Sequence, residues 1–390
     1  MHERRERDIG NETERAMAQM NYLTQCTFDF GALAQLSRVL KALGAARPFV
    51  VTDPGLKANG ILDRLLAALE TPPAGVYAGT PANPTEAASI EAADAYRAAN
   101  ADSIVALGGG SSMDLAKAMG ILVAHEPPLA RYGATERGMR LIKKLPPFVA
   151  VPTTAGTGSE VSPGAVVILE SGRKETFVSP FLVPSAAVCD PELTLGLPPL
   201  LTAATGMDAM THCIEAVLTP TIHPPAEAIG LDGAERAMKH LERAVKDGQD
   251  RDARWHMMMA SFEGALAFAK GLGAVHGLSH ALGRISALKL HHGTLNAVIL
   301  PHSLAMIGNA AEEKFARIRR ALALAPGTDL PQAIADLNAR IGLPANLSNM
   351  GVTEAYWPDA RPYAVSDLAT MSNAVPFDGE KYDELFRRAL

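Results

Sequence analysis

Five of the chain's eleven histidines lie in one apolar stretch, between Gly271 and His302. They are His276, His280, His291, His292 and His302. Their neighbours are Gly, Leu, Ala and Val rather than Lys and Glu, so the stretch is predicted to be buried. Buried ring nitrogens need partners, and a group of them is most simply satisfied by a metal ion. Core histidines that are each hydrogen-bonded separately are the alternative interpretation.

A second pair of candidate metal ligands comes earlier, in the segment GMDAMTHCIEAV. Asp208 and His212 are four residues apart, so in a helix both side chains leave the same face, one turn apart. Alone, they would also fit an ion pair on a helix surface. Together with His276 and the HHG at 291–293 they supply one carboxylate and several imidazoles. That set suits Zn²⁺ or Fe²⁺ with a position left for a substrate oxygen.

A glycine-rich turn, VALGGGSSMDLAK, spans residues 105–117. A predicted strand runs into Gly108, Gly109 and Gly110, and a helix is predicted to begin at the serines that follow. Glycines let the backbone pass close to a bulky anion, and a helix N-terminus presents free N–H groups to it. The turn therefore predicts a diphosphate site, although its spacing is neither GxGxxG nor a Walker P-loop. A tight turn without a ligand is the alternative.

Residues 151–166, VPTTAGTGSEVSPGAV, form a second polar loop after an apolar strand. Three Thr and two Gly lie between Thr153 and Gly158, which is dense for an ordinary surface connection. Ligands of open α/β sheets bind at the carboxyl edge of the strands, so two such loops predict a dinucleotide. Asp53, after the strand PFVVT, could accept hydrogen bonds from ribose and favour NAD over NADP. It could equally begin a turn before Pro54.

The elements that would position these residues change in type near Pro199. Up to that point, predicted strands at 20–31, 48–53, 75–79, 102–107 and 147–153 alternate with helices at 31–44, 60–70, 85–99 and 112–124, and a hairpin follows at 165–178. Such alternation predicts an α/β domain, residues 20–199, with a parallel, Rossmann-like sheet covered on both faces. Residues 200–390 are predicted to form an all-helical domain of about seven to nine helices with Pro and Gly at the joints. The charged residues 1–19 are predicted to be a disordered or loosely ordered extension.

The composition limits the class of protein. A chain of 390 residues with 48% hydrophobic and 20% charged residues fits a globular enzyme of two domains. The net charge of −6 argues against nucleic acid or an anionic membrane as a partner. Neither a secretion signal nor a membrane span is recognisable. Cys26, Cys189 and Cys213 are an odd count in apolar surroundings, which predicts reduced thiols and a cytoplasmic location.

The motifs GGGSSMDLAK, TTAGTGSE, GMDAMTHCIE, HGLSHALG and HHGTLNAVILP, in this order, resemble the iron-containing (group III) alcohol dehydrogenase family from about Asn21 to near the C-terminus. The resemblance implies metal and substrate in a cleft between an α/β dinucleotide domain and a helical domain. It implies metal ligands at Asp208, His212, His276 and His292, with His280 beside the nicotinamide and substrate. It implies cofactor contacts at Asp53, Asn83, Gly109, Gly110, Ser111, Asp114, Thr153, Thr154, Thr157, Ser159 and Lys174.

Within that family the segments NPTEA, VCDPELTLGLP and LHHGTLNAV are most similar to those of 4-hydroxybutyrate dehydrogenases, which interconvert 4-hydroxybutyrate and succinate semialdehyde. The resemblance thus implies an NAD(H)-dependent dehydrogenase that uses Fe²⁺, or Zn²⁺, on a primary alcohol or its aldehyde. It also implies a homodimer or a higher homo-oligomer. A hydroxy acid needs a cation for its far carboxylate. Arg284 and Lys289 are candidates, in a segment that differs in length and composition from many members of the family.

Three alternatives remain open on the sequence. An iron-type dehydrogenase for another short-chain alcohol, diol or hydroxy acid would carry the same motifs. An enzyme like maleylacetate reductase would share the fold and reduce a carbon–carbon double bond without metal, but the full Asp and His set argues against it. A non-catalytic protein that senses NAD would have no need for four metal-type residues.

Overall fold

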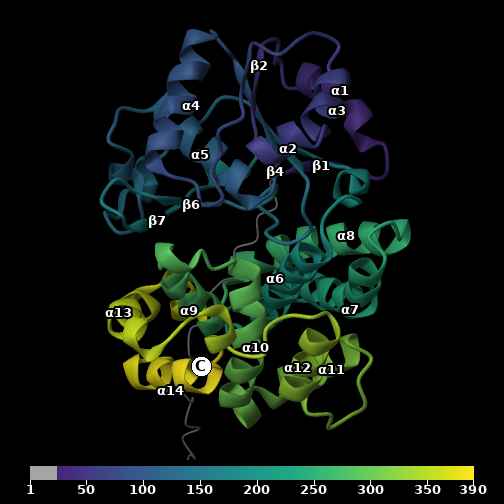
Figure 1. Ribbon diagram of the computed structural model, residues 1–390, viewed down its shortest axis with the longest axis vertical. Coiled ribbons are helices and arrows are strands. Elements are labelled where there is room, and N and C mark those ends of the chain that lie inside the picture. Colours follow the sequence, from purple (N-terminus) through teal and green to yellow (C-terminus); the bar gives the residue numbers. More distant parts are fainter. Residues whose placement is uncertain (1–23) are drawn as a thin grey trace, which may run out of the picture.

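The computed structural model describes residues 24–390, with a sheet-containing half and a helical half (Figure 1). The predicted extension 1–19 and the start of the first predicted strand lie outside the described residues. Six parallel strands form one sheet in the order β1-β8-β5-β4-β2-β3. They are β1 (Gln25–Phe28), β2 (Pro48–Val51), β3 (Gly75–Tyr77), β4 (Ser103–Gly108), β5 (Phe148–Pro152) and β8 (Ala186–Cys189). The predicted parallel sheet is confirmed.

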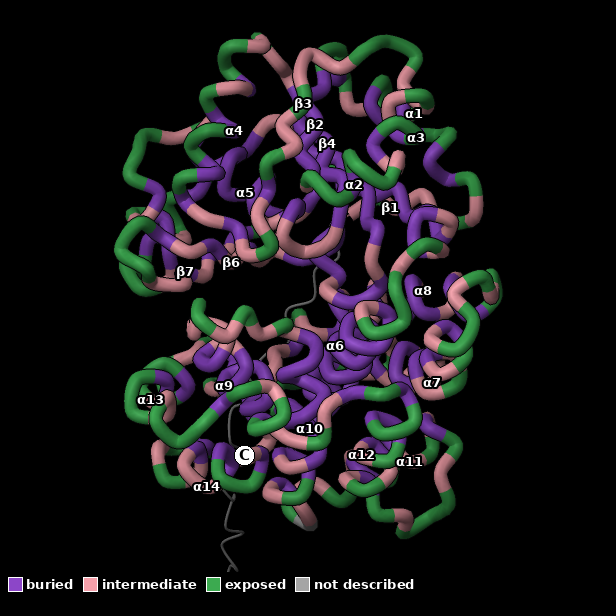
Figure 2. Tube along the Cα trace, viewed as in Figure 1, coloured by how far each residue is buried: buried purple, intermediate pink, exposed green. Residues whose placement is uncertain are grey.

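The sheet is covered on both faces because its strands alternate between two separate cores. Phe49 and Val51 face a core made with α4 (Glu86–Ala98) and α5 (Gly110–Ala124). Val50, between them, faces the opposite core, made with α1 (Leu36–Ala42), α2 (Pro54–Ala58) and α3 (Ile61–Ala67). The inner strands are therefore buried along their whole length, as parallel strands between two helical layers must be (Figure 2).

The strand register brings the carboxyl ends of three neighbouring strands to one edge of the sheet. Val51 pairs with Ala106, and Gly108 pairs with Pro152, so β2, β4 and β5 end side by side. The segments that follow these strands begin at Asp53, at Gly109 and at Thr153. After β5, an antiparallel hairpin of β6 (Gly164–Ile168) and β7 (Lys174–Val178) extends from the same edge.

The second half of the described chain contains nine α-helices. They are α6 (Pro199–Leu218), α7 (Pro224–Lys246), α8 (Arg251–Ala267), α9 (Ala274–Leu282), α10 (His292–Ile307), α11 (Glu312–Ala321), α12 (Leu330–Arg340), α13 (Trp357–Ser366) and α14 (Gly379–Ala389). Helix α6 is buried from Thr202 to Leu218, so it is the centre of the helical core (Figure 2). None of the described helices is both long and apolar enough to cross a lipid bilayer.

The structure differs from the prediction in local detail. The predicted helix at 31–44 is split into a 3-10 turn, η1 (Ala32–Gln35), and α1. The short helix α2 was not predicted, because it begins Pro54-Gly55 and looks like a turn in sequence. Its Leu56 N–H donates to Asp53, and this N-cap offsets the poor helix propensity of its glycine.

Candidate active site

Four side chains predicted as metal ligands come together on three helices. Asp208 and His212 lie on α6, His276 on α9 and His292 at the start of α10. Asp208 Oδ1 lies 3.9 Å from His212 Nε2, 3.9 Å from His276 Nε2 and 3.6 Å from His292 Nε2. The rings of His212 and His276 are stacked with centroids 4.6 Å apart. These distances exceed hydrogen-bond lengths, so three ring nitrogens surround one carboxylate oxygen without bonding to it.

Gly293 explains why His292 can reach Asp208. A Cβ at this position would stand 2.1 Å from the backbone oxygen of Ala204 and 3.2 Å from Asp208 Cβ. Only glycine therefore lets the first turn of α10 lie directly against α6. The HHG sequence thus has a packing reason as well as a chemical one.

A divalent cation fits this set of donors. The amide nitrogen of Asn296 lies between three of them, 2.7 Å from Asp208 Oδ1 and 3.2 Å from Nε2 of both His276 and His292. It stands where the lone pairs of these acceptors converge. Asn296 Oδ1 and His212 Nδ1 are buried and have no hydrogen-bond partner among residues 24–390. The ligand atoms of Asp208, His212 and His276 all lie within 4.8 Å of one another, and His292 Nε2 lies 3.6 Å from Asp208 Oδ1. Such a combination of a carboxylate with imidazoles matches the preferences of Zn²⁺ and Fe²⁺.

The surroundings keep these imidazoles neutral and oriented. Loss of hydration, together with the neighbouring imidazoles, holds the pKa of His276 and of His292 well below the usual range. Glu215, on α6, lies with Oε2 2.6 Å from His276 Nδ1, and its Oε1 accepts from the Val275 N–H at 2.9 Å. Burial raises the pKa of Glu215 to about 7. This contact turns His276 Nε2 toward Asp208, the usual arrangement of a carboxylate behind a metal-binding histidine.

His280 lies one turn after His276 and has a different partner. Its Nδ1 lies 3.0 Å from Oδ2 of Asp367, just before the 3-10 turn η11 (Leu368–Ser372). Its ring stacks on His292 at 5.2 Å between centroids, and its side chain is 26% exposed. Because the Asp367 carboxylate can only accept, Nδ1–H of His280 donates to it, and Nε2 is the nitrogen available to a ligand or to solvent.

The predicted cofactor residues gather at the carboxyl edge of the sheet. A Cβ on Gly109 would lie 3.1 Å from Thr154 Oγ1, and one on Gly110 2.8 Å from Thr157 Cγ2, so the two polar loops are in contact. The Ser111 hydroxyl donates to the Ala82 carbonyl at 2.6 Å and ties the loop carrying Asn83 to the same turn. Helix α5 starts here and directs its N-terminal N–H groups at this edge.

Asp53 begins the turn at Pro54, as one interpretation of the sequence predicts, and its predicted contact with ribose stays a prediction. Its Oδ1 accepts from the Leu56 N–H at 3.0 Å and caps α2. Its Oδ2 has no hydrogen bond within residues 24–390, so one carboxylate oxygen stays available at the end of β2.

Two of the predicted cofactor residues, Asp114 on α5 and Ser159 in the second loop, form hydrogen bonds within the protein. The Ser159 hydroxyl donates to Asp114 Oδ1 at 3.0 Å, and Asp114 Oδ2 accepts from the Val166 N–H at 3.0 Å. The ammonium of Lys117 is the centre of this network. It donates to four oxygens, the Ser159 carbonyl (2.8 Å) and hydroxyl (2.9 Å) and the carbonyls of residues 162 (2.9 Å) and 164 (2.8 Å). These residues fix the shape of the loop.

The polar loop after β5 packs against α6 close to the candidate metal ligands. A Cβ on Gly156 would lie 2.8 Å from Cβ and from the carbonyl of Thr205, one turn before Asp208 on α6. On the other side, the hairpin meets the end of α9, where Lys174 Nζ lies 3.5 Å from the Cβ position of Gly283. Loss of hydration lowers the pKa of Lys174.

The two predicted substrate cations differ in their placement. Arg284 is partly buried, with its guanidinium 3.5 Å from the ring centroid of Tyr363 on α13. Lys289 is exposed on a turn with φ +48°. Of the other two histidines of the opening stretch, His291 is exposed and precedes α10, and His302 lies farther along that helix.

A second histidine cluster lies away from this site, between α7 and α8. His240 and His256 stack at 4.0 Å, with Asp252 3.7 Å from each. Arg243 Nη1 lies 3.2 Å from His240 Nδ1, and Arg236 Nη1 lies 2.9 Å from His256 Nδ1. These guanidinium groups occupy ring nitrogens and supply positive charge, so a cation is disfavoured there.

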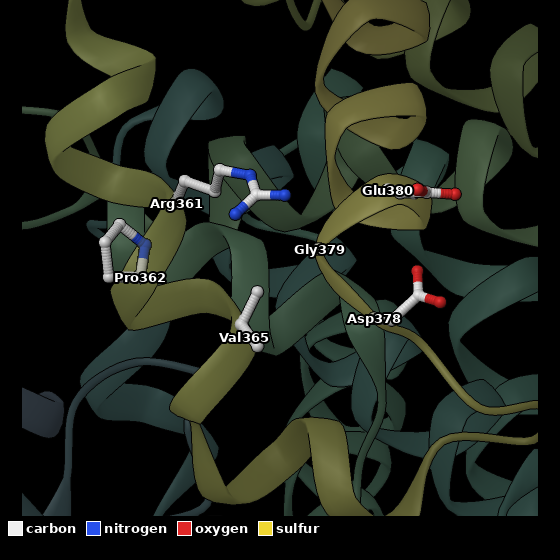
Figure 3. A pocket seen from close by; sticks show the side chains of 6 residues that line it. All are labelled: Arg361, Pro362, Val365, Asp378, Gly379 and Glu380. Atoms are coloured by element: carbon white, nitrogen blue, oxygen red, sulfur yellow. The ribbon is translucent and has the colours of Figure 1, made fainter.

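The pocket in Figure 3 is also separate from the candidate ligands. It lies between α13 and the start of α14 and is lined by Arg361, Pro362, Val365, Asp378, Gly379 and Glu380. Its guanidinium is already paired, because Arg361 Nε donates to Asp383 at 2.7 Å.

Comparisons with known proteins agree with this arrangement. Residues 24–191 match the family model for iron-containing alcohol dehydrogenase, and residues 202–390 match the C-terminal model of the same family. The chain is 48% identical over 382 residues to 4-hydroxybutyrate dehydrogenase of Cupriavidus necator, covering 96% of this chain and 100% of the relative. A solved 1,3-propanediol oxidoreductase superimposes with a TM-score of 0.89 at 32% identity, covering 96% of this chain and 100% of that one. The sulfoacetaldehyde reductase of Bifidobacterium kashiwanohense, solved with NAD⁺, gives 0.87 at 27% identity, covering 96% and 99%. The chain belongs to the iron-containing alcohol dehydrogenase family.

Proposed function

We propose that the protein is a metal-dependent NAD(H) oxidoreductase that interconverts 4-hydroxybutyrate and succinate semialdehyde. The observation that carries the proposal is the contact between the loop at Gly156 and helix α6 at Thr205, one turn from Asp208. It puts a dinucleotide-type loop directly beside a converging set of metal-type ligands. The substrate follows from the 48% identity to the Cupriavidus necator enzyme over its whole length.

Asp208, His212, His276 and His292 would hold the metal, with Fe²⁺ preferred and Zn²⁺ possible. Bound there, the ion supplies Lewis acidity at the substrate oxygen, and NAD supplies the hydride acceptor. The low pKa of His276 favours its neutral ring, which leaves one of its two ring nitrogens as a lone-pair donor for a metal. Glu215 prevents His276 from rotating away.

NAD would lie along the carboxyl edge of the sheet. The N–H groups at Gly110 and Ser111 would bind the diphosphate, and the free oxygen of Asp53 would accept from the ribose. The Thr154 and Thr157 hydroxyls line the same path. Lys117 does not touch the cofactor in this proposal, but holds the loop that does.

His280 would carry the proton of the alcohol. Asp367 fixes its Nδ1–H, so Nε2 can accept a proton on the substrate side and release it to water through its exposed edge. The nearby rings of His276 and His292 orient it.

The proposal is tested by NADH oxidation with a panel of aldehydes and semialdehydes, after reconstitution of the protein with Fe²⁺ or with Zn²⁺. We expect succinate semialdehyde to be the best substrate. Succinate semialdehyde no better than butanal would remove the 4-hydroxybutyrate assignment and leave another alcohol or diol. Full turnover in metal-free protein would instead favour a metal-independent reductase.

We further propose that the chain acts as two domains, residues 20–199 and 200–390, and assembles as a homodimer in the cytoplasm. Strand β1 is an edge of the sheet, and its free side offers backbone groups to a second copy. The three cysteines are free thiols, as a reducing compartment would keep them. Light scattering during gel filtration measures the oligomeric state.

A further inference from the structure

We infer that Arg284 binds the far carboxylate of the substrate, so that the site selects short ω-hydroxy acids and their semialdehydes over neutral alcohols. This inference rests on the proposed alcohol–aldehyde chemistry and deepens it. The metal ligands and the cofactor loops do not explain a preference among substrates, whereas a cation at Arg284 would.

Arg284 lies in the turn just beyond α9, which ends at Leu282. It is four residues after His280, and Gly283 between them keeps a helical backbone, with φ −62° and ψ −8°. Side chains one turn apart on a helix are about 5–6 Å apart at Cβ. With C–C bonds of about 1.5 Å, the first and last carbons of a four-carbon chain are roughly 4 Å apart. A substrate that reacts beside His280 can therefore present its carboxylate to Arg284.

The guanidinium of Arg284 packs against an aromatic ring and pairs with no carboxylate of the described residues. It lies flat over the Tyr363 ring, 3.5 Å from its centroid. Within residues 24–390 it makes no hydrogen bond and no ion pair. Stacking fixes the plane of the group while its in-plane N–H donors stay free, which is the geometry for bidentate binding of a carboxylate.

The negative charge of Glu175 acts on Arg284, but the Glu175 carboxylate already has two other partners. Glu175 Oε2 pairs with Arg173 at 2.9 Å, and its Oε1 accepts from the Thr135 N–H at 3.0 Å. Lys174, next to Gly283, adds positive charge to the same side of the site. The two other carboxylates that act on Lys174 are also engaged, Asp114 with Ser159 and Asp367 with His280, so within residues 24–390 none of these acids pairs with Arg284. Lys289, the other cation of this segment, is exposed and contacts none of these groups in the described structure.

The test compares Arg284→Gln and Arg284→Lys with the unaltered enzyme, each loaded with the same metal. For Arg284→Gln we expect kcat/KM for succinate semialdehyde to fall about 10- to 100-fold, mainly through KM. The value for butanal should stay within about twofold, because butanal has no carboxylate. Arg284→Lys should fall between, since it keeps the charge and loses the bidentate geometry. Arg320→Gln, which removes an exposed charge on α11, is the control for net charge.

Two results would overturn the inference. One is an equal loss for both aldehydes in Arg284→Gln, which would indicate general damage. The other is an unchanged preference in that variant, or its loss in Lys289→Gln instead.

A binding measurement separates this inference from the proposed function. Butyrate carries the carboxylate but no reacting group, so calorimetric titration of the enzyme–NADH complex with butyrate needs no turnover. At least tenfold weaker binding in Arg284→Gln supports the inference even if succinate semialdehyde is a poor substrate. Equal binding in both proteins, or no binding in either, contradicts it.

Discussion

Nδ1 of His276 lies 2.6 Å from Oε2 of Glu215, inside the core of the helical half. The two residues are 61 apart in sequence and lie on different helices. Glu215 is seven residues after Asp208, so both are on the same face of α6. One helix therefore carries a candidate ligand and also the carboxylate that orients another one.

Removal of this orienting carboxylate should weaken metal binding without touching a ligand. We expect Glu215→Ala to lower the affinity for Zn²⁺ by about 10- to 100-fold, because His276 loses the contact that directs its Nε2. Competition with a fluorescent chelator measures the affinity. Asp252→Asn, in the second histidine cluster, should leave it unchanged. An unaltered affinity in Glu215→Ala would argue that His276 is not a ligand.

Metal removal should abolish activity reversibly, whereas loss of a ligand should abolish it permanently. We expect dialysis against a chelator to stop NADH oxidation and added Fe²⁺ or Zn²⁺ to restore it. His276→Ala and His292→Ala should neither retain the metal nor respond to its addition. Elemental analysis and circular dichroism measure occupancy and folding. Full occupancy and turnover in either variant would contradict the ligand assignment.

Lys117 should matter for stability and for cofactor binding at once. Its ammonium donates to four oxygens of the second loop, and Lys117→Met leaves all four without this donor. We expect a loss of about 3 kcal/mol or more in the free energy of unfolding. NADH should also bind more weakly, because the loop loses its anchor. Lys239→Met, which removes an exposed pair with Glu235, should cost less than about 1 kcal/mol.

Sequence patterns predicted the large features because these depend on local periodicity. Alternation of apolar strands and helices predicted the parallel sheet, and Pro and Gly breaks predicted the helical half. The candidate ligands could be selected because their residue types are rare in apolar surroundings.

The partners of these residues could not be predicted in the same way. Asp367 is 87 residues from His280, and the packing of α13 and η11 against α9 brings them together. Lys117 belongs to the glycine-rich motif that the sequence shows. Its four acceptors could not be predicted, because they depend on the path of a loop about 45 residues later. Glu215 and Asn296 had a detectable signal, since each follows a predicted ligand at helical spacing.

The pH dependence of stability should reveal the buried carboxyl group of Glu160. Burial raises its pKa to about 7, although the neighbouring Lys117 opposes this shift. An ordinary Glu in the unfolded chain has a pKa of about 4.3. Between these values the folded protein retains a proton that the unfolded chain has lost, so stability falls as pH rises through this window. Above about pH 7 the full cost, roughly 4 kcal/mol, should be present. Glu160→Gln cannot ionise, so its stability relative to the unaltered protein should increase from pH 5 to pH 7 and then stay level. Chemical denaturation of both proteins across this range measures the difference, and a constant difference would show that Glu160 is ionised in the folded state throughout.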